Sequence, residues 1–187
     1  MLTRGRTDLE AGLDTIRSAP RGTGTVELIV RRPGVDEREI VDEARLDVTD
    51  GLVGDGWRSR GSSAMPDGSA DPEAQLTLMN ARVAQLVAGD RERWGLAGDQ
   101  LYVDLDLSVD HLPPGTRLAV GSAVIEVSPT PHTGCSKFSG RFGLEALAFI
   151  STPTGKGLRM RGVNTRVVSS GTVRTGDAIR RLDPPPG

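Results

Sequence analysis

The sequence predicts a mainly β fold with a few helices, arranged as a closed or nearly closed β-barrel. Short runs rich in β-branched residues recur along the chain and are separated by glycine-containing turn pairs. Only two or three segments show the helical spacing of apolar residues. Aromatic residues make up 3% of the chain, so Val, Leu, Ile and Ala must fill most of the core. Closure is favoured because it removes aggregation-prone strand edges.

The N-terminal segment has helical character. Residues 7–18 predict a short amphipathic helix that ends before Pro20, because three apolar residues recur at helical spacing: Leu9, Leu13 and Ile16. We expect residues 1–21 to form a helical appendage in front of a single domain that spans residues 22–182.

Two early strands and a long loop follow. The run VELIVRR at 26–32 predicts a strand that ends at the turn signal Pro33-Gly34, and residues 38–57 predict a second strand region that ends in glycines. Residues 58–73 are rich in Gly, Ser, Pro and Asp and offer no apolar face for burial. They predict a mobile surface loop, of the kind that often covers a site.

The second half combines one strand-to-helix unit with hairpins. In residues 75–89, QLTLM has strand character, Asn80 can cap a following helix and Gly89 can end it in a left-handed conformation. Residues 143–152, GLEALAFIST, predict a further helix. The later β-branched runs are separated by three predicted hairpin turns: Gly121-Ser122, Ser170-Gly171 and Gly176-Asp177. Residues 183–187, DPPPG, cannot continue a regular element and predict a flexible tail.

Charge and cysteine content narrow the class of protein. The net charge is -2, with both signs mixed along the chain, which favours neither nucleic acid nor a membrane surface as a partner. No apolar window is long enough to cross a bilayer, and the first residues lack the pattern of a targeting peptide. One cysteine excludes an intrachain disulfide, so we expect a cytoplasmic protein.

The single cysteine lies in PHTGCSKFSGRFG, residues 131–143. A lone cysteine is usually a small buried hydrophobe. Around Cys135, however, a glycine permits close approach, and Lys137 and Arg141 add positive charge that favours the thiolate, which is both a nucleophile and a metal ligand. His132 can act as a catalytic base or orient the thiolate, or it can be an ordinary surface residue.

Several basic residues are candidates for an anion site. Lys137 and Arg141 suit a phosphate group, with surface salt bridges as the alternative. Arg159 and Arg161 alternate, so on a strand both would point to one face. Thr133 adds a hydroxyl group to these candidate residues. The sequence contains no glycine-rich phosphate loop and too few Cys and His residues for a structural zinc site.

Four stretches together resemble a MOSC domain, the module named after the C-terminal part of molybdenum cofactor sulfurases. The likeness spans roughly residues 22–182, and its strongest element is Cys-x-Lys-Phe…Arg-Phe-Gly, followed at a distance by Arg-Gly-Val-Asn and Gly-x-Val…Gly-Asp. The stretches are GLVGDGW, QLTLMN, the region from GDQLYV to SGRFG, and RGVNTRVVSSGTVRTGDAIR.

This resemblance implies a barrel-like fold and a role for Cys135 in molybdenum cofactor chemistry. Lys137 and Arg141 would then bind the terminal phosphate of the pterin cofactor, and the other candidate cofactor-binding residues would be Thr133, Arg159 and Arg161. The thiolate would be a molybdenum ligand in an enzyme that reduces N-hydroxylated substrates with electrons from a partner protein, or a persulfide carrier supplied by a sulfur donor protein. A non-catalytic binding barrel with a packed cysteine is the third possibility. Many bacterial members carry Gly-Asp-Arg-His where this chain reads Gly54-Asp55-Gly56-Trp57-Arg58, so the substrate of better-known relatives does not transfer directly.

Overall fold

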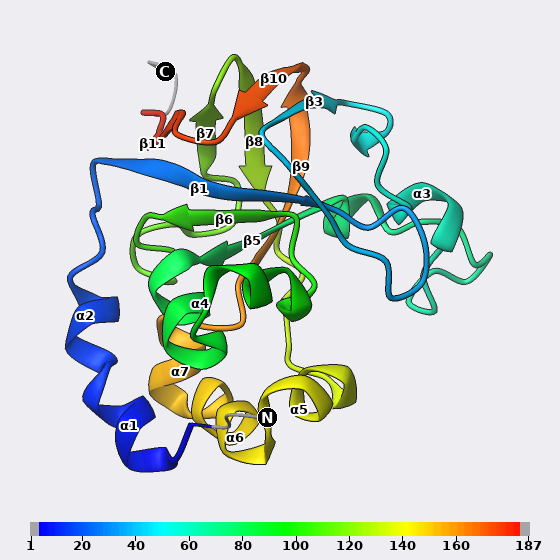
Figure 1. Ribbon diagram of the computed structural model, residues 1–187. Helices are drawn as coiled ribbons and strands as arrows, with labels where there is room; N and C mark the ends of the chain where they lie inside the picture. The colour runs from blue at the N-terminus through cyan, green and yellow to red at the C-terminus, as the bar shows by residue number, and fades with distance from the viewer. Residues whose placement is uncertain (1–3, 184–187) are drawn as a thin grey trace.

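The computed structural model describes residues 4–183, and its main feature is a closed β-barrel (Figure 1). Seven strands form the ring in the order β11-β7-β8-β9-β5-β6-β1, and β11 pairs back with β1. β2 extends the sheet beside β1. The predicted barrel is therefore confirmed. The strands of this sheet are β1 Thr23–Arg31, β2 Glu39–Val41, β5 Leu76–Asn80, β6 Leu101–Asp104, β7 Arg117–Val120, β8 Ala123–Val127, β9 Val163–Ser169 and β11 Ala178–Arg181.

One strand pair in the barrel is parallel. β5 and β6 run in the same direction, whereas the other pairs are antiparallel. A parallel pair needs a crossover connection, and α4 (Ala81–Ala88) and the 3-10 helix η2 (Arg91–Ala97) supply it. The Asn80 side chain accepts hydrogen bonds from the backbone N–H groups of Arg82 and Val83, and Gly89 follows the helix with φ 74°. The strand-to-helix unit predicted for residues 75–89 is confirmed.

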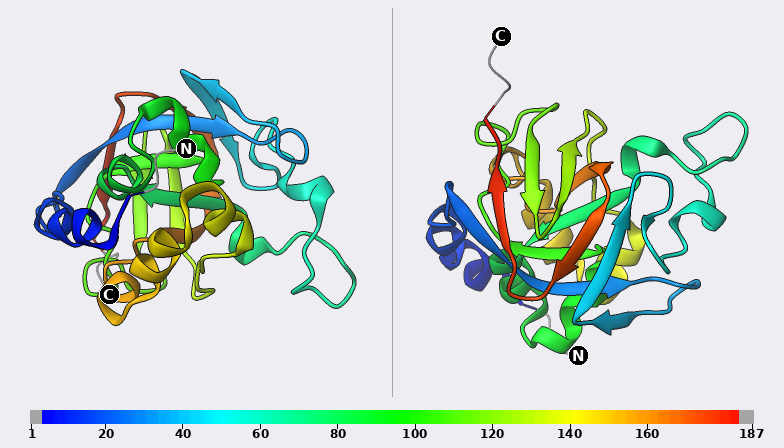
Figure 2. Two further views of the ribbon diagram at one scale, coloured as in Figure 1. Left: turned by 60° about the horizontal axis from the view of Figure 1, so that its bottom comes forward. Right: turned by 90° about the horizontal axis from the view of Figure 1, so that it is seen from above.

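Only one of the three predicted hairpin turns joins two paired strands. Gly121-Ser122 connects β7 to β8. The hairpins predicted at Ser170-Gly171 and Gly176-Asp177 are wrong, because β10 (Gly171–Arg174) pairs with β3 (Glu43–Asp47). β3 also pairs with β4 (Gly51–Leu52) in a separate three-stranded sheet, and Figure 2 shows β10 and β3 side by side. This pairing places Val173 opposite Ala44 and buries both in the barrel core.

Helices cover the outer face of the barrel on one side and enclose a second core. Figure 1 shows α5 (Ser136–Phe142), α6 (Leu144–Ser151) and α7 (Pro153–Gly157) gathered below the strands. The predicted helix at 143–152 is confirmed as α6. One apolar cluster fills the barrel, and the other joins its outer face to the helices. The segment that leads to Cys135 therefore runs from a barrel strand to this helical layer.

The N-terminal segment packs on the helical layer. It forms two short helices, α1 (Arg6–Ala11) and α2 (Leu13–Arg17), rather than the single helix expected. Leu9 and Ile16 are buried in the same cluster as Phe149 of α6. The division of the chain at residue 21 stays a prediction.

The Gly- and Ser-rich segment contains little regular structure. It begins with α3 (Trp57–Arg60) and ends with the 3-10 helix η1 (Pro72–Ala74), and the Trp57 indole Nε1 donates to the Asp71 carbonyl at 3.2 Å. Its mobility stays a prediction. The predicted C-terminal tail lies, apart from Asp183, outside the described residues. Within residues 4–183, no helix has both the length and the apolar character needed to span a membrane.

Candidate functional site

Cys135 lies at the surface, at the junction between a loop and a helix. The loop from Ser128 leads out of β8, and the Cys135 carbonyl accepts hydrogen bonds from the N–H groups of Phe138 and Ser139 in the first turn of α5. Phe138 and Phe142 are 1% and 2% exposed and anchor this short helix in the core. Cys135 itself is exposed and free. The alternative of a packed cysteine is therefore wrong.

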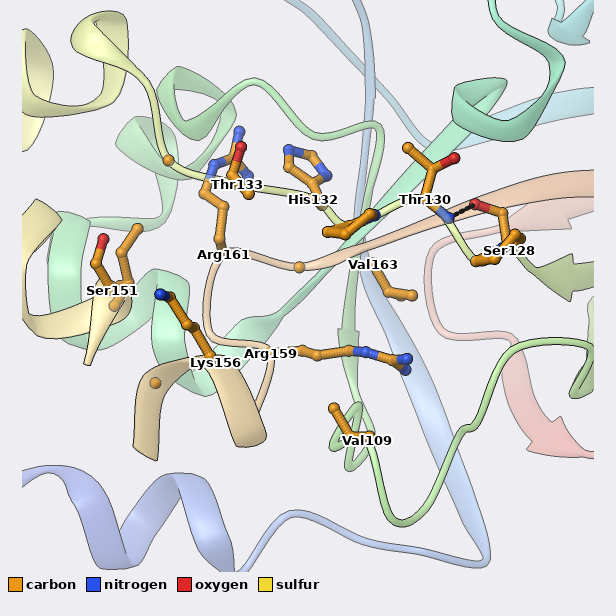
Figure 3. A pocket seen from close by; sticks show the side chains of 16 residues that line it. Val109, Ser128, Thr130, His132, Thr133, Ser151, Lys156, Arg159, Arg161 and Val163 are labelled. Atoms are coloured by element: carbon orange, nitrogen blue, oxygen red, sulfur yellow. Dashed lines mark hydrogen bonds between the residues drawn. The ribbon is translucent and has the colours of Figure 1, made fainter. Parts of the chain in front are cut away.

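The loop before Cys135 forms one wall of a cavity of about 360 Å³ (Figure 3). Its other walls come from the end of α6, from α7, from the turn before β9 and from Val109. Hydroxyl groups and three basic residues line it, and none of its 16 described lining residues is Asp or Glu. The cavity can therefore accept an anionic organic ligand. The basic residues are Lys156, Arg159 and Arg161.

Arg159 and Arg161 both line the cavity, but not in the way the sequence predicted. β9 begins only at Val163, so the two residues lie in a turn, and Arg159 has a positive φ of 46°. Their side chains point in different directions in Figure 3. The Arg159 Nη1 donates to the Leu112 carbonyl at 2.5 Å, and burial lowers the pKa of Arg159. The expected alternation on a strand is wrong because the chain turns here.

Arg161 turns away from Arg159 and belongs to a buried charged group. Its Nη1 lies 2.6 Å from Oδ2 of Asp99, and Asp99 is fully buried. Its guanidinium also lies over the Phe138 ring, 5.4 Å from the centroid. The Arg161 Nε is buried without a hydrogen-bond partner among the described residues. The guanidinium is thus fixed by Asp99 while one of its donors is unused.

His132 reaches the same carboxylate from the cavity loop. Its Nδ1 lies 3.7 Å from Oδ1 of Asp99, and both atoms are buried without a hydrogen bond in the described part of the chain. Burial, followed by the positive charge of Arg161, lowers the pKa of His132 from 6.5 to about 4, although Asp99 acts in the opposite direction. The imidazole is therefore neutral at neutral pH.

Lys137 and Arg141 do not line the cavity. Both contact Asp36 in the segment between β1 and β2, with distances to Oδ1 of 3.4 Å for the Lys137 Nζ and 2.7 Å for the Arg141 Nη2. The Arg141 Nη1 also donates to the Leu96 carbonyl at 2.8 Å. Their suggested role as phosphate ligands stays a prediction.

The structure adds residues that sequence reasoning missed. Asp99 was part of the Gly-Asp pair in GDQLYV, but nothing local showed that it contacts His132 and Arg161, 33 and 62 residues away. Lys156 had a weak signal, since it is one of only two lysines. Within residues 4–183, no group of three or more His, Cys, Asp or Glu side chains is placed to hold a metal ion.

Comparison with protein families resolves the identity of this barrel. The model of the MOSC domain matches residues 68–180, which is more than half of the chain. The chain belongs to the MOSC domain family. The matched region contains Cys135, the lining of its cavity and Asp99. A search of curated proteins by sequence finds no match.

Solved structures support the MOSC fold. The YuaD protein from Bacillus subtilis superposes with a TM-score of 0.62 at 16% identity, over 85% of this chain and 95% of that one. YiiM from Escherichia coli gives a TM-score of 0.54 at 22% identity, over 86% and 70% of the two chains. YiiM from Geobacillus stearothermophilus gives 0.58 at 16%, over 86% and 75%. At these identities the similarity establishes the fold of this MOSC domain.

Proposed function

We propose that this MOSC domain binds the molybdenum cofactor at the cavity beside Cys135, with the Cys135 thiolate as a ligand of the metal. The observation that carries the proposal is an exposed thiol that directly follows a cavity wall, in a cavity with three basic residues and no carboxylate. A thiolate is a soft ligand, and it suits a metal already bound by the dithiolene sulfurs of a pterin.

The cavity residues fit a phosphate-bearing pterin. The Lys156 ammonium has no carboxylate within 4.0 Å across residues 4–183, and the Arg161 Nε is a buried donor with no partner there. An anion would satisfy both groups. Lys156, Arg159 and Arg161 would hold the phosphate, and hydroxyl groups would bind the polar edges of the pterin. These hydroxyls belong to Ser128, Thr130, Thr133 and Ser151.

The activity proposed is the reduction of N-hydroxylated or related small substrates. Converting an N–OH group to N–H consumes two electrons and two protons and releases one water. The bound cofactor would supply the two-electron chemistry, and a redox partner protein in the cytoplasm would supply the electrons. The chain itself binds the anion, holds the substrate near Cys135 and offers the His132 imidazole in the cavity wall as a group that can relay a proton.

Replacement of Cys135 tests the proposed ligation. The wild-type protein, purified from cells that make the cofactor, is expected to contain close to one molybdenum and one pterin per chain. Cys135→Ser should lose most of the metal, because a hydroxyl is a poor substitute for a soft thiolate. Molybdenum is measured by elemental analysis and pterin by fluorescence after oxidation.

The matched control is Ser136→Ala, which changes the adjacent exposed residue and leaves the thiol intact. Its metal content should equal that of the wild type. Undiminished molybdenum in Cys135→Ser, with both variants folded, would show that Cys135 is not the ligand.

The exposure of the thiol also favours a second function, that of a persulfide carrier. The Cys135 thiolate would attack the outer sulfur of a donor protein's persulfide, the donor S–S bond would break, and the donor thiol would leave as a thiolate. No net oxidation is required. The exposed position of Cys135 allows such an approach.

Mass spectrometry tests this second function. Incubation with a persulfide donor is expected to add the mass of one sulfur atom to the wild type and none to Cys135→Ser. Reduction with a thiol should remove the added mass. An unmodified wild-type protein, under conditions that load a known carrier protein, would contradict sulfur transfer and leave the cofactor proposal untouched.

A further inference from the structure

Four arginines surround one turn of the backbone next to the candidate site. The turn ends η2 and spans Gly95–Gly98, and each of its four consecutive carbonyls accepts a hydrogen bond from a different guanidinium. Carbonyls at the end of a helix lack partners within the helix, so these bonds complete the turn. The pairs are Arg38 Nε to Gly95 at 3.0 Å, Arg141 Nη1 to Leu96 at 2.8 Å, Arg161 Nη2 to Ala97 at 2.9 Å and Arg32 Nη1 to Gly98 at 2.6 Å.

Three of these arginines have a carboxylate partner, and the fourth does not. Asp55, Asp36 and Asp99 pair with Arg32, Arg141 and Arg161, respectively. Arg38 donates only to the carbonyls of Gly95 and Glu37, and no carboxylate oxygen within residues 4–183 lies within 4.0 Å of it.

Arg60 of α3 adds a fifth guanidinium that lacks a counter-charge of its own. Its Nη2 lies 3.9 Å from Oδ1 of Asp55, but that oxygen already accepts from Arg32 Nη2 at 3.0 Å and from the Trp57 N–H at 2.9 Å. In the described structure the Arg60 guanidinium makes no hydrogen bond, and its side chain is 43% exposed. It is therefore open to a ligand.

The positive charges of Arg38, Arg60 and the neighbouring arginines repel one another. Burial lowers the pKa of Arg60, and the charges of Arg32 and Arg38 lower it further. Burial likewise lowers the pKa of Arg38, and Arg141 and Arg32 add to this effect. Holding like charges together costs free energy, which a bound anion offsets.

We propose that Arg38 and Arg60 form a phosphate-binding site that is separate from the cavity. A guanidinium can bind two phosphate oxygens at once. Both groups lie near the already neutralised Arg32, because Arg38 donates to the same Gly95–Gly98 turn and Arg60 lies near the same Asp55 carboxylate. Neither residue lines the cavity, and both lie before residue 68, where the match to the family model begins. The site thus lies outside the region matched by the family model, and it selects ligands that carry a phosphate group.

Phosphate titration of the purified protein tests this site. Binding is measured by calorimetry with inorganic phosphate and with glycerol phosphate, at constant ionic strength set with chloride. Arg60→Gln and Arg38→Gln are each expected to weaken phosphate binding about tenfold or more, because each removes a charge-assisted hydrogen-bonding group. Tighter binding of glycerol phosphate would identify phosphorylated small molecules as the ligands, and equal binding would identify free phosphate.

Two control variants make the result decisive. Arg58→Gln changes a residue of the same helix that pairs with Asp50, at 2.6 Å, and should bind phosphate like the wild type. Arg166→Gln changes an exposed arginine that pairs with Glu126, at 2.6 Å, and should also leave this binding intact. Wild-type affinity in both Arg60→Gln and Arg38→Gln, or an equal loss of affinity in Arg58→Gln and Arg166→Gln, would overturn the proposal. Neither result bears on molybdenum content, so the cofactor proposal is tested independently.

Discussion

Asp55→Asn is expected to lower the free energy of unfolding by about 3 to 5 kcal/mol, the usual result of removing one partner from a buried ion pair. The Asp55 side chain is fully buried and accepts four hydrogen bonds: from the N–H, Nε and Nη2 of Arg32 and from the N–H of Trp57. The Arg32 side chain is only 10% exposed. An asparagine keeps the shape but leaves this guanidinium buried without its opposite charge.

The measurement is urea unfolding, followed by circular dichroism. Asp50→Asn provides the matched control, since Asp50 is 52% exposed in its pair with Arg58. Exposed pairs contribute about 0 to 1 kcal/mol, so this variant should unfold almost like the wild type. Equal losses in the two variants would show that the Arg32–Asp55 pair does not anchor the segment between β4 and α3.

Acidification is expected to destabilise the wild type more than His132→Gln. The folded-state pKa of His132 is about 4, below the 6.5 of an unhindered histidine, so the unfolded chain binds a proton more readily. The contribution of the neutral imidazole is fully present above pH 6.5 and is lost as the pH falls towards 4. A pKa difference of this size between the folded and the unfolded chain corresponds to about 3 kcal/mol of unfolding free energy.

The test compares the unfolding free energies of the two proteins from pH 7 to pH 4. The difference between them should change by about 3 kcal/mol in favour of the variant at the acid end. The pKa of His111 is also lowered by burial, but this residue is present in both proteins and cancels in the comparison. Parallel curves would show that His132 does not remain neutral in the folded protein. The charged groups that face His132 are Asp99, Arg161 and Arg32.

Local sequence patterns predicted where the strands and helices of the barrel lie better than they predicted which strands pair with each other. The run at 75–89 contains its own strand, cap and terminating glycine, and each forms as expected. Gly121-Ser122 likewise defines its hairpin locally. Ser170-Gly171 has the same composition, yet β10 pairs with β3 more than 120 positions earlier. Turn chemistry specifies where the chain can bend, whereas the burial of Val173 decides which strand it joins.

In the candidate site, too, local sequence predicted the exposure of single residues but not their long-range contacts. The glycine and the charged residues around Cys135 correctly indicated an exposed thiol. The basic residues closest to it in sequence, Lys137 and Arg141, contact Asp36, which lies about 100 positions earlier. Residues further along the chain, including Lys156, line the cavity instead.

Periodicity, caps and turns act over a few residues, so local sequence is enough to specify a barrel of short strands, a strand-to-helix crossover and an accessible cysteine on a glycine-containing loop. The pairing of the charged side chains, in contrast, depends on the complete fold. Asp99, His132 and Arg161 come together because the end of η2, the cavity loop and the turn before β9 pack against one another. A charged side chain can pair with any opposite charge that the fold brings within reach, so the choice of partner depends on long-range packing.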